Sequence, residues 1–285
     1  MSTGTTTSAG PDRADALRPV GRPGRPPAQE YRPLLGWAVT DALTVTRRNL
    51  VGQLRQPQIL VFAAIQPIMF TLLFRYVFGG AITVPGVDYV DYLMAGVFVQ
   101  TVVFGGIATA VGLTEDLASG VVDRFRSLPM ARSAVLTGRV LADVARNLLS
   151  ITLMVAVGLA VGFRPDSVAG LLAAVGLLLL LGVAFSWYYA LVGLVVGNAE
   201  AAQAAGFLVI FPLTFASSAF VPTGSMPGWL RAFADNQPIT AAIDAIRALV
   251  LGQPLGEVVP VALAWIAAIT VVMAALAITR YRRAR

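Results

Sequence analysis

One charged stretch interrupts an otherwise apolar sequence and offers side chains for binding a partner. Residues 115–132, EDLASGVVDRFRSLPMAR, carry six charges and lie between two long hydrophobic runs. The apolar residues of the stretch recur at intervals of four, four and three, and this spacing places them on one face of a helix. That face consists of Leu117, Val121, Phe125 and Leu128, and the opposite face consists of Glu115, Ser119, Asp123 and Arg126. The pattern predicts a short amphipathic helix that binds another protein.

A solvated loop is the alternative interpretation of this stretch, because Gly120 weakens the helical pattern and Pro129 ends it. A plain loop, however, has little reason to keep an apolar face that includes a phenylalanine. We therefore favour a docking segment, which we place at residues 114–133. The residues that we expect at its interface are Glu115, Asp116, Asp123, Arg124, Phe125, Arg126, Leu128 and Pro129.

The residue types that are missing exclude most catalytic chemistry. The sequence contains no Cys and no His, so the usual zinc, iron–sulfur and haem ligand sets and the Ser-His-Asp triad cannot be built. All 21 basic residues are Arg. Without Lys the phosphate-binding loop G-x-x-x-x-G-K-[ST] cannot exist, so any ATP must be bound by another polypeptide. We expect no catalytic residue, no cofactor and no metal in this chain.

The elements that position the charged stretch are long apolar helices. Hydrophobic residues make up 57% of the sequence and the mean hydropathy is +0.75, values typical of a membrane protein. A helix needs about 20 apolar residues to cross a bilayer. We predict an all-α integral membrane protein with six transmembrane helices, at residues 59–78, 93–113, 140–163, 169–196, 203–221 and 258–279.

Two segments precede the first span. Residues 1–33 are rich in Gly, Pro, Ser, Thr and Arg, a composition that predicts a disordered tail. Residues 34–56 combine helically spaced leucines with arginines and predict an amphipathic helix that lies on membrane lipid. The six-span domain then occupies residues 57–285.

The placement of arginine predicts the orientation. An even number of spans leaves both termini on one side, and the arginines concentrate there: in the N-terminal region, in the loop after the second span and in the C-terminal tail. The loop after the first span, GGAITVPGVDYVDY, carries Asp88 and Asp91 and no cation. By the positive-inside rule both termini are cytoplasmic, and the net charge of +6 reflects topology rather than nucleic-acid binding.

A second unusual segment, residues 222–256, is too polar to span the membrane and too apolar for a solvated loop. We predict two short helices that meet at DNQP, because Pro238 breaks the first and Thr240 can open the second. Asp244 and Arg247, three residues apart, are predicted to pair, and Trp229 to lie at headgroup depth. The segment reads as a re-entrant or interfacial pair on the outer side. Its candidate site residues are Pro227, Gly228, Trp229, Pro238, Asp244 and Arg247.

Polar residues inside the spans are expected mainly to hold helices together. They are Gln66, Gln100, Thr101, Ser186, Trp187, Tyr188, Tyr189, Thr214, Ser217 and Ser218. The first turns of the third span carry Arg139, Asp143 and Arg146 on one face, so we expect that span to begin in the headgroup zone. The middle of the spans is free of ionisable residues, which argues against a proton-coupled pump.

Three stretches carry a resemblance to a known family. They are RQPQILVFAAIQPIMFTLLFRYVFGG at the first span, DRFRSLPMARSAVLTGR after the second, and FVPTGSMPGWLRAFADNQPITAAIDAIRAL before the sixth. With the spacing of the spans, they make the chain resemble the permease subunits of ABC-2 type exporters, and most closely the daunorubicin-resistance permeases. The likeness covers residues 31–285 and excludes the N-terminal tail.

The resemblance implies a half-transporter in the plasma membrane. Two copies of the permease would form a homodimer and bind two copies of a separate ABC ATPase. Residues 114–133 would be the coupling helix, which docks into the ATPase and carries its motion to the spans. Residues 34–56 would be the elbow helix, and residues 222–256 the outer re-entrant pair.

The cargo and the residues along its path stay open. Hydrophobic drugs or antibiotics are the usual cargo of such permeases, but lipids and polysaccharides travel through related ones. A secondary transporter working alone would be expected to show internal repeats, and the two halves show no self-similarity. A membrane scaffold that anchors a partner through the charged loop is the third alternative.

Overall fold

The computed structural model describes residues 46, 57–82, 84–119 and 132–283. The chain divides into two units, Met1–Arg32 and Pro33–Arg285, and all described residues belong to the second. Their regular structure is entirely helical, which confirms the predicted all-α class for this part of the chain. The helices are α2 (Pro57–Leu72), the π-helix η2 (Leu73–Phe78), α3 (Tyr89–Gly105), α4 (Ile107–Ala118), α6 (Arg132–Ala160), α7 (Val168–Val195), α8 (Ala199–Phe215), the 3-10 helix η3 (Thr223–Ser225), α9 (Gly228–Asp235), α10 (Pro238–Val250) and α11 (Val258–Arg283).

Four helical stretches are long and apolar enough to cross a membrane: Tyr89–Ala118, Leu136–Ala160, Val168–Val195 and Val258–Tyr281. Two shorter apolar helices, Ala64–Phe78 and Ala199–Phe215, fall at the predicted first and fifth spans. The chain is therefore a multi-pass membrane protein. The count of six crossings remains a prediction.

Helix boundaries differ clearly from the sequence-based ones in three places. The helix of the third predicted span, α6, begins eight residues before the predicted residue 140, at Arg132. The second predicted span is longer, because α3 and α4 follow each other with only Gly106 between them and reach Ala118. The fifth predicted span is shorter: α8 ends at Phe215, whereas the apolar run continues to residue 221. Residues 216–222 turn instead of continuing the helix, because side chains from α3 and α10 bind their backbone, as described below.

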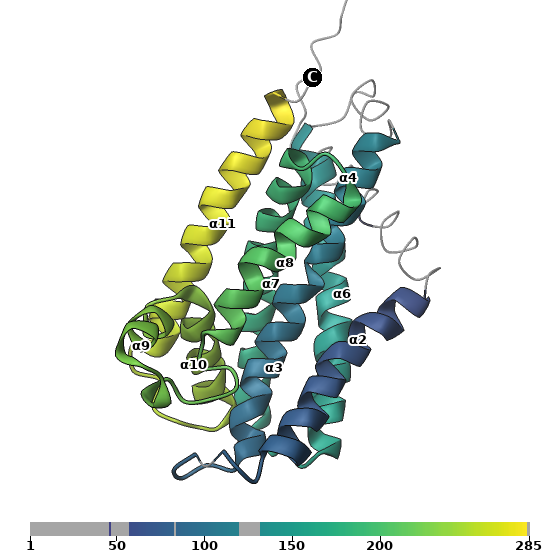
Figure 1. Ribbon diagram of the computed structural model, residues 1–285. Coiled ribbons are helices and arrows are strands. Elements are labelled where there is room, and N and C mark those ends of the chain that lie inside the picture. Colours follow the sequence, from purple (N-terminus) through teal and green to yellow (C-terminus); the bar gives the residue numbers. More distant parts are fainter. Residues whose placement is uncertain (1–45, 47–56, 83, 120–131, 284–285) are drawn as a thin grey trace, which may run out of the picture. The chain divides into compact units, whose positions relative to one another are not determined.

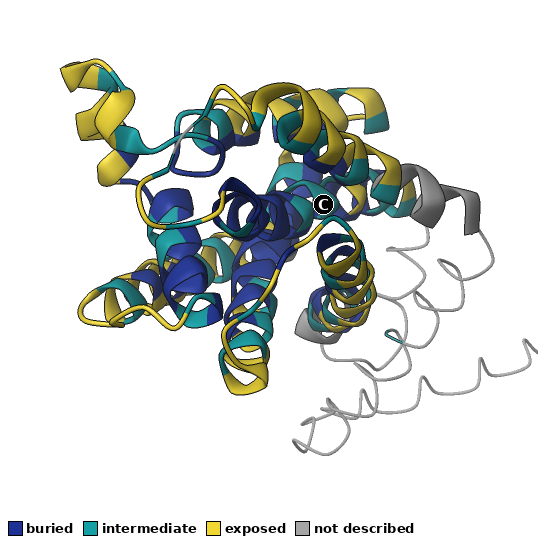
Figure 2. Ribbon diagram, turned by 90° about the horizontal axis from the view of Figure 1, so that it is seen from below, coloured by how far each residue is buried: buried dark blue, intermediate teal, exposed yellow. Residues whose placement is uncertain are grey.

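Helix α3 lies at the centre of the bundle and is buried on nearly all sides. Figure 1 shows it between α2 and α8, with α6 and α7 close by. Thirteen of its seventeen residues are buried. Viewed along the helices, buried segments occupy the middle and exposed faces point outward (Figure 2). A helix that is apolar all round suits such a position.

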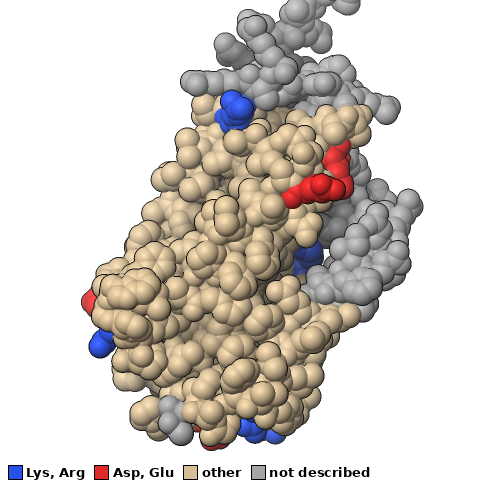
Figure 3. Space-filling model, viewed as in Figure 1, with Lys and Arg blue, Asp and Glu red and all other residues tan. Residues whose placement is uncertain are grey.

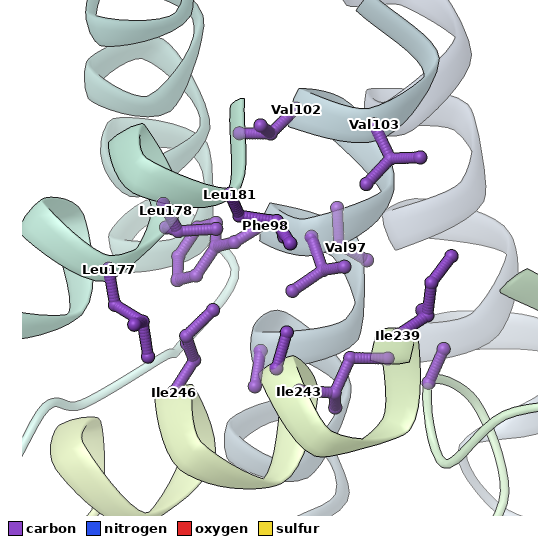
Figure 4. Packing of buried hydrophobic residues seen from close by; sticks show 14 of the residues in the cluster. Val97, Phe98, Val102, Val103, Leu177, Leu178, Leu181, Ile239, Ile243 and Ile246 are labelled. Atoms are coloured by element: carbon purple, nitrogen blue, oxygen red, sulfur yellow. The ribbon is translucent and has the colours of Figure 1, made fainter. Parts of the chain in front are cut away.

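Three helices bring branched and aromatic side chains together in the core. Val97, Phe98 and Val102 of α3 face Leu178 and Leu181 of α7, and isoleucines of α10 close the cluster from below (Figure 4). These isoleucines are Ile239, Ile243 and Ile246, each fully buried. The short helix α10 is thus part of the core, although it is too short to span a membrane.

The surface is apolar over a broad belt. Figure 3 shows a face of mostly uncharged side chains, with charged ones gathered mainly toward its two ends. Large exposed hydrophobic residues such as Leu208 and Val271 contribute to this belt. Lipid can solvate such a surface, whereas water could not.

Parts of the predicted organisation lie outside the described residues. They are the N-terminal tail, all of residues 34–56 except Thr46, and residues 120–131 of the docking segment. Thr46 is helical, and its hydroxyl donates a hydrogen bond to the carbonyl of Gly138 in α6 (3.0 Å). This bond connects the predicted interfacial helix to the start of α6.

Candidate functional site

The segment before the last helix contains the two short helices expected from the sequence. Helix α9 ends at Asp235 and α10 begins at Pro238. Proline is favoured in the first turn of a helix because it has no N–H to leave unpaired. Gln237 precedes the helix as its N-cap residue, and Thr240 lies buried inside the first turn. The prediction that Thr240 opens this helix is therefore wrong; Pro238 does so.

Asp244 and Arg247 form the predicted ion pair on α10. Arg247 Nη1 lies 2.7 Å from Asp244 Oδ1. Only 7% of Arg247 is exposed, and its remaining donors reach backbone: Nη2 to the carbonyl oxygens of Ser218 (2.7 Å) and Tyr92 (3.4 Å). Its guanidinium carbon lies 3.7 Å from the centroid of the Tyr92 ring. A buried guanidinium requires this many partners, because its desolvation is costly.

The same cluster holds the turn that follows α8. Ser218 Oγ donates to Asp244 Oδ1 (2.7 Å), and the Tyr92 hydroxyl donates to the Ser218 carbonyl (2.9 Å). We call Tyr92, Ser218, Asp244 and Arg247 the Arg247 anchor. It joins α3, the turn after α8 and α10, which lie far apart in the sequence. No pattern in the sequence predicts that Tyr92 and Ser218 belong to this cluster.

Gln237 completes the attachment. Its amide nitrogen donates to the carbonyl oxygens of Leu213 (2.7 Å) and Ala216 (2.8 Å). Carbonyls in the last turn of a helix have no partner within the helix, so this amide serves as their cap.

Gly96 of α3 lies against Ala219, where a Cβ atom would collide with the Ala219 backbone.

The other predicted residues of this segment lie on α9 or at its start. Pro227, Gly228 and Trp229 are exposed, and 77% of Trp229 is accessible. Their exposure leaves them available to lipid, to cargo or to another subunit. The predicted headgroup depth of Trp229 stays a prediction.

The opposite end of the bundle carries the start of the docking segment. Glu115 and Asp116 lie in the last turns of α4, so the segment begins as a continuation of that helix. Glu115 is exposed, whereas Asp116 is half-buried and pairs with Arg139 of α6 (2.9 Å). The other six predicted interface residues lie outside the described residues: Asp123, Arg124, Phe125, Arg126, Leu128 and Pro129.

The polar face of α6 lies against α4. Asp143 is 2% exposed and accepts a hydrogen bond from Thr109 Oγ1 (2.5 Å), and its other oxygen lies 3.1 Å from Arg146 Nη1. The shared face of Arg139, Asp143 and Arg146 led to the expectation that the span begins in the headgroup zone, and that depth stays a prediction. In the structure, Arg139 and Asp143 on this face make side-chain contacts to α4. The contribution of Thr109 was missed.

The polar residues of the spans have different surroundings. Ser217 and Ser218 hydrogen-bond within the turn after α8 or with α10, in agreement with a role in holding helices together. Gln100 and Tyr189 are buried in the described bundle with side-chain atoms that lack a hydrogen-bond partner there. Gln66 faces outward. In the described ranges, no three acidic residues are grouped so as to hold a metal ion.

Comparison with known proteins assigns most of the chain to a family. Residues 40–251 match the ABC-2 type transporter family. The chain belongs to this family. The matched range covers α2 to α10, and therefore contains the Arg247 anchor, the docking segment and the α4–α6 contacts.

Relatives of this ABC-2 permease include named drug-resistance proteins. It is 37% identical over 224 residues, 78% of each chain, to the daunorubicin resistance ABC transporter permease protein DrrB1 of Streptomyces coeruleorubidus. It is 27% identical over 86% of its length, and 90% of the relative's, to the probable doxorubicin resistance ABC transporter permease protein DrrC of Mycobacterium tuberculosis. A more distant relative is the putative transport permease ycf38 of Cyanophora paradoxa, at 23% identity over 74% of each chain.

Membership of the family gives the ABC-2 permease a partner. Permease subunits of this kind lack the ATPase and work with a separate subunit that has it. The absence of Lys agrees with this division of labour, because the phosphate-binding loop of ATPases needs one.

Proposed function

We propose that this permease exports a hydrophobic small molecule, such as a drug or antibiotic, using the energy of ATP hydrolysed by a separate subunit. The observation that carries the proposal is the 37% identity to a daunorubicin resistance permease over 78% of both chains. The apolar belt fits a cargo that enters from the bilayer, since such molecules partition into lipid before transport (Figure 3).

Residues 114–133 are proposed to receive the motion of the ATPase. The supporting contacts lie at the base of the segment, where Asp116 pairs with Arg139 and Leu117 packs against a cluster that includes Leu113, Leu136 and Val140. Apolar residues of the segment supply buried area in the interface, and its charges supply orientation. The ATPase must bind one arrangement of the permease better than the other, because otherwise no motion results.

The remaining organisation is proposed from the sequence and the family. The chain crosses the membrane six times with both termini in the cytoplasm, and two copies form a homodimer. Residues 34–56 form the elbow helix, and the bond from Thr46 to Gly138 supports its contact with α6. Helices α9 and α10 form the outer re-entrant pair, and the burial of α10 between α3 and α7 supports this assignment (Figure 4).

Transport by reconstituted vesicles tests the proposal. The permease and its partner ATPase are co-reconstituted, and the movement of daunorubicin across the vesicle membrane is followed by its fluorescence. We expect ATP-dependent movement that disappears when the phosphate-binding Lys of the ATPase is replaced by Ala. Movement that is unaffected by this ATPase variant, or that occurs with the permease alone, would show that the chain is not an ATP-driven export subunit.

A second arm separates the cargo classes. Export of a lipid or polysaccharide by the same architecture is the competing possibility, and lipid is the cargo tested here. The same vesicles are loaded with a fluorescent phospholipid in one leaflet. ATP-dependent transfer of the lipid with no movement of daunorubicin would assign lipid as the cargo.

A further inference from the structure

The two helices that enter and leave the docking segment are joined by polar contacts at two levels. Near their ends, Arg139 Nη1 donates a hydrogen bond to Asp116 Oδ2 (2.9 Å). Deeper in the bundle, the Asp143 carboxylate accepts from Thr109 Oγ1 and pairs with Arg146. On α4 the two levels are about two turns apart, and on α6 about one turn apart. We call these five residues the α4–α6 ladder.

Small residues on the α3–α4 side allow the ladder to form. A Cβ atom on Gly112 would collide with Arg139 Nη2, so the guanidinium lies directly over this glycine. Gly105 faces Asn147, but a Cβ atom there would make only an ordinary contact, 3.6 Å from Asn147 Oδ1. Arg139, Asp143 and Asn147 are spaced by four, so they form one polar row along α6. The row fixes the register of α6 against α4.

Burial makes these contacts strong enough to resist separation. The Asp143 and Arg146 side chains are 2% and 10% exposed, and those of Arg139 and Asp116 are 16% and 26% exposed. Charges attract more strongly where water is excluded, and removing one partner of a buried pair takes away stabilisation that water does not replace. Sliding of α4 along α6 would therefore break several contacts at once.

We infer that Asp116 and Arg139 are positioning residues that make α4 and α6 move as one body when the docking segment moves. The inference rests on the proposed coupling role of residues 114–133. A force on the segment then reaches both helices together and passes to α7, which packs on both, and to α8, which packs on α4. The bond from Thr46 to Gly138, the neighbour of Arg139, adds the predicted elbow helix to the same body.

Spin labels test the rigidity of the pair in the permease alone. The chain has no Cys, so Ser119→Cys at the end of α4 and Leu141→Cys on α6, both exposed, can be labelled without background. We expect a narrow distance distribution that broadens when Asp116→Asn is added. The matched control is Glu200→Gln, which neutralises an exposed acid in the first turn of α8 and should leave the distribution narrow. An unchanged width in Asp116→Asn would overturn the inference.

Labels on the complex with the ATPase test the transmission of motion. A reference label at exposed Val271→Cys on α11 is paired with Ser119→Cys or with Leu141→Cys, and labelled permease is diluted with unlabelled copies. When ATP is trapped on the ATPase, both distances should shift in the parent protein. In Asp116→Asn only the Ser119 distance should shift, and equal shifts of both would contradict the inference. Absence of any shift in the parent would instead count against the coupling role, while the width measurement would still decide the rigidity of the pair.

A further experiment replaces the Asp116–Arg139 ion pair by a covalent cross-link, so that the inference can still be tested if Asp116→Asn misfolds. Asp116→Cys and Arg139→Cys are introduced together and joined by a short thiol cross-linker. In this variant the distance labels at positions 119, 141 and 271 are carried by a ketone-bearing amino acid instead of Cys, so that thiol reagents act only on the new pair. If the two helices move as one body, the cross-linked permease keeps both ATP-induced shifts, and the same protein without cross-linker loses the Leu141 shift. Loss of the shifts on cross-linking would show that the helices must separate, which is the opposite of our inference.

Discussion

Arg247 stacks on Tyr92, with its guanidinium carbon 3.7 Å from the ring centroid and two of its nitrogens 3.4 Å from the carbonyl oxygen of the same residue. The two residues lie 155 positions apart in the sequence. Their contact attaches the short helix α10 to the first turn of the central helix α3. The segment before the last span is thereby part of the bundle rather than a separate surface loop.

Removal of Arg247 should be among the most destabilising single changes in the chain. Arg247→Ala removes the charged partner of the Asp244 carboxylate, which keeps only the hydroxyl of Ser218, and it removes a donor from the carbonyls of Tyr92 and Ser218. We expect a loss of about 1.5–3 kcal/mol in the free energy of unfolding. Arg247→Lys should recover only part of it, because an ammonium group cannot reproduce the planar fork. Denaturant unfolding in detergent micelles measures both variants.

The matched control for this prediction is Arg231→Ala on α9. Arg231 pairs with Asp235 across one helical turn, but both side chains are largely exposed. An exposed pair contributes about 0–1 kcal/mol, so this variant should be close to the parent in stability. Equal effects of the two substitutions would show that burial of Arg247 is not what makes it important.

Gly96 should tolerate no side chain. Gly96→Ala places a methyl group against the backbone of Ala219, which cannot move without disturbing the Arg247 anchor, and we expect a cost of about 1–3 kcal/mol. Gly176→Ala on α7 is the comparison, because that position has open space around it. Alanine is the better helix former by about 1 kcal/mol, so Gly176→Ala should be neutral or stabilising in the same unfolding measurement.

The docking segment should lose its partner when its apolar face is charged. Phe125→Asp combined with Leu128→Asp is expected to abolish co-purification with the ATPase, because a buried carboxylate opposes burial of the interface. Membrane insertion of the permease should be unaffected. Ser119→Asp, on the predicted polar face, serves as the control and should retain the ATPase. A complex that survives the double substitution undiminished means that the segment does not dock in this way.

Labelling of introduced cysteines tests the orientation. Gly197 and Gly224 each have open space around them, at the turn between α7 and α8 and in the turn before α9. In intact cells a membrane-impermeant maleimide should label Gly224→Cys but not Gly197→Cys, which should react only after permeabilisation. The chain itself has no Cys to give background. The reverse pattern would invert the proposed topology.

Local patterns in the sequence predicted a large part of this architecture. The Asp244–Arg247 pair was predicted because residues three apart share a helix face. The two helices around DNQP were predicted because Pro238 interrupts a helix, although Thr240 was wrongly expected to open the second one. The long apolar runs likewise predicted the spanning helices. Each of these features depends only on neighbouring residues.

Features that depend on distant residues could not be predicted. The apolar run after α8 gives no sign that the helix stops at Phe215, because the amide that caps its last turn belongs to Gln237. Nothing local assigns Tyr92 to Arg247. The shared face of Arg139, Asp143 and Arg146 was predicted, but Thr109, which binds Asp143, looks like any other threonine in an apolar helix.

Two of the atoms that bind Arg247 are the carbonyl oxygens of Tyr92 and Ser218. Every amino acid brings such an oxygen, so mutation at those two positions leaves this part of the attachment in place. Position 247, in contrast, must carry Arg, because the donors of these bonds belong to its side chain. Random mutagenesis followed by selection for a working exporter should therefore recover small residues that fit the buried position 218, even without the hydroxyl that binds Asp244, and almost no alleles at 247.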